Sequence, residues 1–64
     1  MKTLRELVLE EIERRQIPKR QFIQESGLAI DSNRIYRWLK GYGMMREDKL
    51  EKVRAWLADN GRRV

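Results

Sequence analysis

The sequence lacks cysteine and histidine, and this absence excludes two broad classes of functional site. The chain has no disulfide staples, no thiolate or imidazole ligands for a metal ion, and few means of building a nucleophile–base pair. Its carboxylates are scattered along expected helix faces without acid–base partners. We therefore expect a protein that is not an enzyme and that uses no metal, no cofactor and no small-molecule ligand.

Long apolar runs are missing as well, and none approaches the ~20 residues that a membrane-spanning helix needs. We expect no membrane partner, and a chain without cysteine is compatible with the reducing cytoplasm. The 64 residues are expected to form one domain, 1–64, with room for only a small core.

Positive charge, by contrast, is in excess, and the formal net charge is +5. Residues 1–16 carry four bases and four acids, residues 17–45 five bases and two acids, and residues 46–64 six bases and four acids. Between Glu25 and Glu47 the only acid is Asp31. Because carboxylates repel phosphates, this distribution favours a polyanionic partner, with chance clustering in a small basic protein as the alternative.

Two long segments have apolar residues at helical spacing, which predicts amphipathic helices over about 3–16 and 46–59. Thr3 and Glu6 have the spacing of a capping box at the start of the first. Asn60-Gly61 predicts the end of the second. The expected core stripes consist of Leu4, Leu7, Val8, Ile12, Leu50, Val53 and Leu57. The charged residues of the first helix, Glu11 among them, are expected mostly outside its stripe.

A shorter helix is expected over about 18–26. Pro18 is predicted to open it, because proline is favoured at the first helical position. Gly27 is predicted to end it, because glycine tolerates the left-handed conformation found after helix ends. The apolar segment 28–30 is expected to tuck into the core as a turn.

Another helix is expected over about 31–41, capped by Asp31 or Ser32. Its apolar face consists of Ile35, Trp38, Leu39 and Tyr42, at positions i, i+3, i+4 and i+7. At about 100° per residue, the opposite face consists of Asn33, Tyr36, Arg37 and Lys40. Arginine can form two parallel bonds to guanine in the major groove, and asparagine can do so to adenine. The face suits DNA, although any amphipathic helix also places polar residues outside.

The order of these two short helices is typical of a helix-turn-helix, in which the second helix enters the major groove and the first crosses the backbone. The segment 35–41 (IYRWLKG) resembles the end of the recognition helix in Cro/repressor-type proteins of the lambda-repressor-like class, with isoleucine, tryptophan and glycine spaced by two residues. Leu50, Val53 and Leu57 resemble the apolar positions of the helix that follows in that family. The resemblance covers about residues 3–59.

The resemblance implies an all-α, compact domain of four to five helices that binds double-stranded DNA sequence-specifically and regulates transcription as a repressor. It places the base contacts on Ser32, Asn33, Tyr36, Arg37 and Lys40. We expect phosphate contacts from Lys19, Arg20, Gln21, Arg34 and Arg46.

The turn departs from the family pattern. If Phe22-Ile23 replaces the family's leucine–alanine pair, the turn to Ile35 is two residues longer than usual. The ungapped alternative places Gln21 at the family's phosphate-contacting glutamine but puts Gln24 and Glu25 at positions that are normally apolar or small, where burial is costly. We prefer the longer turn.

The resemblance also implies a homodimer on two half-sites. Trp56, at the margin of the apolar stripe of the helix expected over 46–59, is the candidate contact. Trp56 completes the core of a single chain in the alternative interpretation. Two other functions stay open: a protein–protein adaptor that kept the helix-turn-helix shape, and an accessory factor that bends DNA in recombination or packaging. The small size suggests a phage or plasmid origin.

Overall fold

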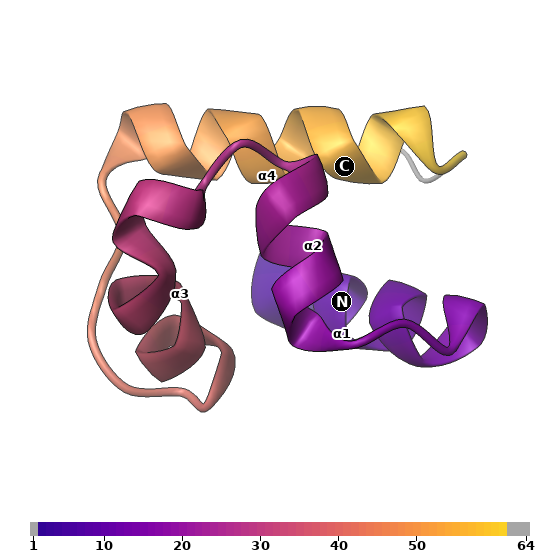
Figure 1. The fold of residues 1–64 in the computed structure, drawn as a ribbon, viewed down its shortest axis with the longest axis horizontal. Coiled ribbons are helices and arrows are strands. Elements are labelled where there is room, and N and C mark those ends of the chain that lie inside the picture. The colour runs from indigo at the N-terminus through magenta and orange to yellow at the C-terminus, as the bar shows by residue number, and fades with distance from the viewer. Residues whose placement is uncertain (1, 62–64) are drawn as a thin grey trace.

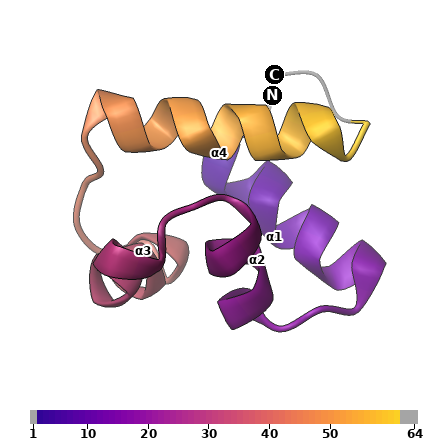
Figure 2. The same cartoon turned by 45° about the horizontal axis from the view of Figure 1, so that its top comes forward.

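The computed structural model describes residues 2–61, which form four α-helices and one short 3₁₀ helix and no strand. The elements are α1 (Leu4–Arg15), α2 (Lys19–Glu25), η1 (Ala29–Asp31), α3 (Ser32–Leu39) and α4 (Glu47–Asp59). α1 packs against α4 and α3, and α2 packs against α3. Figures 1 and 2 show α4 along one side of the molecule, with α2 and α3 next to each other below it. The expected all-α fold is confirmed.

α1 begins as predicted, because the Thr3 hydroxyl accepts a hydrogen bond of 3.2 Å from the Glu6 amide. Val8 and Ile12 are buried on its inner face. The expectation that Glu11 lies outside this stripe is wrong, because its side chain is fully buried. A step of about 100° per residue places position 11 about 60° from Val8, between Leu4 and Leu7 of the expected stripe. Arg14 compensates the buried charge, donating to Glu11 through Nε at 3.0 Å and through Nη2.

The first three α-helices share one type of C-terminal cap. After α2, the Gly27 amide donates to the Gln24 carbonyl at 3.2 Å and the Leu28 amide donates to the Ile23 carbonyl at 3.0 Å. These two bonds define a Schellman motif, which needs one residue with positive φ. That residue is Gln16 after α1, Gly27 after α2 and Gly41 after α3.

The segment between α2 and α3 differs from the expected turn. Pro18 precedes α2 as an extended N-cap and is not its first helical residue. Leu28 is buried as predicted, but Ile30 is 98% exposed, so the expectation that 28–30 tucks wholly into the core is wrong. η1 causes this difference, because a 3₁₀ helix has about three residues per turn and points successive side chains to different sides.

α3 ends at Leu39, earlier than predicted, and this ending removes Tyr42 from its apolar face. Tyr42 is 69% exposed, because Gly41, with a φ of 95°, turns the chain away before it. A side chain at Gly41 would also meet the guanidinium of Arg5, which lies against this turn.

The core gathers side chains from every α-helix and from both long connections. Its buried members are Val8, Ile12, Phe22, Ile23, Leu28, Ile35, Leu39, Met45, Val53, Trp56 and Leu57. Trp56 is only 4% exposed, and its ring meets Phe22 edge-to-face at a centroid distance of 4.7 Å. The interpretation of Trp56 as a dimer contact is therefore wrong, because this side chain completes the core of one chain.

Candidate nucleic-acid interface

α3 presents a polar face to solvent and an apolar face to the core. Asn33, Arg37 and Lys40 are exposed, whereas Ile35 and Leu39 are buried. The sequence therefore predicted these five orientations correctly. The spacing of the three exposed residues, i, i+4 and i+7, aligns their side chains along one side of the helix.

Two other predicted base-contacting residues lie at the edge of this face. Ser32 and Tyr36 are half-buried, and Tyr36 packs against the core. Tyr36 has therefore less free surface than the wheel alone indicates. Trp38 is also half-buried against the core, on the apolar side as expected.

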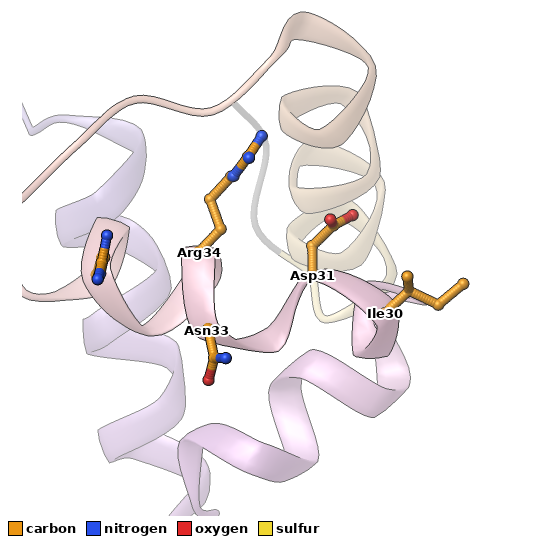
Figure 3. A pocket seen from close by; sticks show the side chains of 5 residues that line it. Ile30, Asp31, Asn33 and Arg34 are labelled. Atoms are coloured by element: carbon orange, nitrogen blue, oxygen red, sulfur yellow. The ribbon is translucent and has the colours of Figure 1, made fainter.

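A hollow of about 340 Å³ lies beside the first turns of α3. Its lining residues are Ile30, Asp31, Asn33, Arg34 and Arg37. Figure 3 shows that Asn33 points to the opposite side of α3 from Arg34 and Asp31. The lining of the hollow thus includes an apolar side chain, a carboxamide, two guanidinium groups and a single carboxylate.

That carboxylate, Asp31, is paired with α4. Its Oδ2 lies 2.8 Å from Nζ of Lys49. The hydrogen bond from Lys49 lowers the pKa of Asp31, and the nearby charge of Arg34 lowers it further. Asp31 occupies the N-cap position of α3, but its side chain makes no capping hydrogen bond. The one acid between residues 26 and 46 is therefore neutralised by an ion pair.

The cations among the predicted base- and phosphate-contacting residues form no ion pair with a carboxylate in the part of the chain that the structure describes. Within residues 2–61, no hydrogen bond or ion pair joins an acidic side chain to Lys19, Arg20, Arg34, Arg37, Lys40 or Arg46. Arg34 and Arg37 lie on α3 and Lys40 is its C-cap, whereas Lys19 and Arg20 begin α2 and Arg46 is the N-cap of α4. By contrast, α1 and α4 pair most of their cations, as in Arg15–Glu25 and Arg54–Glu47. Positive charge that α1 and α4 largely neutralise is thus left without an ion pair on α3, at the start of α2 and at Arg46.

Gln21 differs from the other predicted phosphate contacts, because it is already hydrogen-bonded. Its Nε2 donates to Oε2 of Glu25 at 2.9 Å, and the residue is half-buried. Glu25 also accepts from Arg15 at 2.8 Å and from Nε1 of Trp56 at 3.0 Å. These bonds, the one from Arg15 foremost, lower the pKa of Glu25 to about 2.

The Glu25 network fixes the end of α2 and was missed in the sequence. Its members, Arg15, Gln21, Glu25 and Trp56, come from three helices. Only the spacing of Gln21 and Glu25, four residues apart on one helix, is a local signal for it.

Comparison with known protein families, with curated proteins and with solved structures gave no match for this chain. Among residues 2–61, no cluster of three or more acidic side chains is arranged to hold a metal ion. No helix in the same range has the length and apolar character needed to cross a bilayer.

Proposed function

We propose that this protein binds double-stranded DNA sequence-specifically and regulates transcription, with α3 as the recognition helix. The observation that carries the proposal is the exposed face formed by Asn33, Arg37 and Lys40, whose side chains have no acidic partner in the described chain. Asparagine and arginine are the side chains best suited to bidentate contacts with adenine and guanine.

The dimensions of α3 support the same function. An α-helix with its side chains is about 10–12 Å across, which fits the ~12 Å width of the major groove, and the eight residues of α3 give it a length of about 12 Å. α2 packs against α3, so we propose these two helices as a helix-turn-helix pair with residues 26–31 as an extended turn. In this arrangement α2 crosses the backbone, and its first residues, Lys19 and Arg20, contact phosphates.

The charge of the surface supports DNA over other partners. Asp31, the acid closest in sequence to α3, is paired with Lys49. A phosphate backbone approaching α3 therefore meets free cations from three elements and no unpaired carboxylate of that segment. Contacts of this kind position the protein, whereas base contacts provide the specificity.

Selection of duplexes from a random pool, followed by substitution of two residues of the polar face, tests this proposal. We expect Arg37→Ala and Asn33→Ala each to weaken binding to the selected site by about 1–3 kcal/mol and to relax preference at one base position. Lys52→Ala removes a cation from α4 and is the control, expected to leave the base preference unchanged. Unaltered preference in both α3 variants would contradict the assignment of the recognition helix.

The selected motif also tests whether the protein acts as a homodimer. A symmetric dimer on two half-sites requires a palindromic motif with centres about one helical turn of DNA apart. A single asymmetric half-site indicates binding as a monomer.

A further inference from the structure

Ile30 is the most exposed large apolar side chain in the part of the chain that the structure describes. Its exposed fraction is 98%, compared with 89% for Met44 and 69% for Tyr42. Isolated apolar residues are common on protein surfaces, so this exposure alone indicates no function. The position of Ile30 beside α3 is what distinguishes it.

Ile30 lines the same hollow as Asn33, Arg34 and Arg37 (Figure 3). Its backbone is held in place, since it lies in η1, where the Asp31 amide donates to the Leu28 carbonyl at 3.0 Å. Leu28, at the start of this turn, is anchored in the core. A β-branched side chain has few rotamers, so Ile30 presents a nearly fixed apolar surface next to the polar face of α3.

An apolar surface among cations and an amide matches one feature of the major groove. Each base pair shows donors and acceptors there, and thymine adds a C5 methyl group, which apolar side chains contact. Arg34 and Arg37, which line the same hollow, supply positive charge that complements the phosphates near such a base. We infer that Ile30 contacts the C5 methyl group of a thymine adjacent to the base read by Asn33 or Arg37. This inference rests on the proposed function.

Replacing thymine by deoxyuridine tests the contact, because it removes only the methyl group. In the duplex selected by the wild-type protein, each thymine is replaced in turn and the affinity is measured. We expect one replacement to weaken wild-type binding about fourfold, the effect of exposing roughly one methyl group. Ile30→Ala should bind the parent duplex about fourfold more weakly and should show no further loss at that position.

Two control variants identify the source of the effect. Met44→Ala removes another exposed apolar side chain and should bind like the wild type, with the same sensitivity to deoxyuridine. Asn33→Ala should lose preference at its own base yet keep the sensitivity to the missing methyl group. Because Ile30 is almost wholly exposed, its alanine variant should keep the circular dichroism spectrum of the wild type.

The outcomes separate this inference from the proposed function. If the losses of affinity caused by Ile30→Ala and by deoxyuridine simply add when the two are combined, the Ile30 contact is overturned and DNA binding is left intact. The same conclusion follows if no deoxyuridine replacement in the selected motif changes the affinity. If Ile30→Ala loses self-association but its DNA affinity still depends on the thymine methyl group as in the wild type, the Ile30–thymine contact is also overturned. Ile30 is then assigned to a contact between protein chains. Failure of the wild-type protein to select any duplex overturns both.

Discussion

Glu25 joins three helices that are far apart in the sequence. Its carboxylate accepts hydrogen bonds from Arg15 on α1, Gln21 on α2 and Trp56 on α4. The ionised form is the acceptor in all of these bonds, which is why the pKa of Glu25 falls to about 2. A carboxylate whose pKa is lowered by folding stabilises the folded state above its ordinary pKa and loses that effect as the pH falls through its folded pKa.

Glu25→Gln should therefore flatten the dependence of stability on pH. We expect the variant to be less stable than the wild type at neutral pH by about 1 kcal/mol, a modest value because the Arg15–Glu25 pair is partly exposed. The difference should shrink as the pH falls from about 4.5 to about 2. Urea unfolding at a series of pH values measures this difference.

Glu51→Gln serves as the control, since Glu51 is exposed and makes no hydrogen bond or ion pair with another side chain of residues 2–61. Its stability should follow the wild-type curve at every pH. Parallel curves for the wild type and Glu25→Gln would show that ionisation of Glu25 does not contribute to the pH dependence of stability.

At the scale of single residues, the sequence predicted orientations within a helix better than contacts between helices. Asn33, Arg37 and Lys40 are exposed as expected, because a helix wheel needs only local periodicity. Trp56 was placed at the margin of its stripe, but α2 brings Glu25 and Phe22 to it, and its ring is buried. Such burial depends on tertiary packing, which periodicity does not encode.

At the scale of elements, the helix ends show which local signals are reliable. Glycines at 27, 41 and 61 mark three ends with positive φ, as their sequence positions indicated. α1 ends with the same geometry at Gln16, which has a φ of 54°. The Gln16 amide donates to the Glu13 carbonyl at 3.1 Å, and the Ile17 amide donates to the Ile12 carbonyl at 3.2 Å. A left-handed residue other than glycine costs about 1–2 kcal/mol.

Gln16→Gly should consequently stabilise the protein. We expect a gain of about 0.5–1 kcal/mol, because the relief of left-handed strain exceeds the entropic cost of a glycine. Gln24→Gly makes the same chemical change at an exposed position inside α2, where it should destabilise by about 0.5–1 kcal/mol. Thermal unfolding of both variants measures the effects, and destabilisation by Gln16→Gly would contradict the assigned cap geometry.

At the scale of the whole molecule, charge is divided between paired and unpaired cations. Ion pairs tie Lys2, Arg14, Arg15, Lys49 and Arg54 to carboxylates, whereas the cations on α3, at the start of α2 and at Arg46 have no such partner in residues 2–61. The sequence predicted the regional excess of charge, because acids are rare between positions 25 and 47. It did not predict that Lys49 neutralises Asp31, because this pair depends on how α4 packs beside η1.

This division predicts how DNA binding should depend on salt. Each neutralised phosphate contributes about −0.9 to the slope of log Kobs against log salt concentration. Contacts from Lys19, Arg20, Arg34 and Arg46 therefore predict a slope of about −4. Arg46→Gln should make the slope less steep by about 1 and weaken binding equally on all sequences. Titrations at several salt concentrations measure both effects.

Arg54→Gln is the matched control, because it removes the same charge from a cation that Glu47 already pairs at 2.9 Å. Its slope should equal that of the wild type, since a paired cation has less charge to offer a phosphate than a free one. An equal change of slope in Arg54→Gln and Arg46→Gln would mean that net charge, and not the free cations near α3, sets the affinity. A wild-type slope near zero would instead favour the protein–protein adaptor, because counterion release accompanies every contact with the DNA backbone.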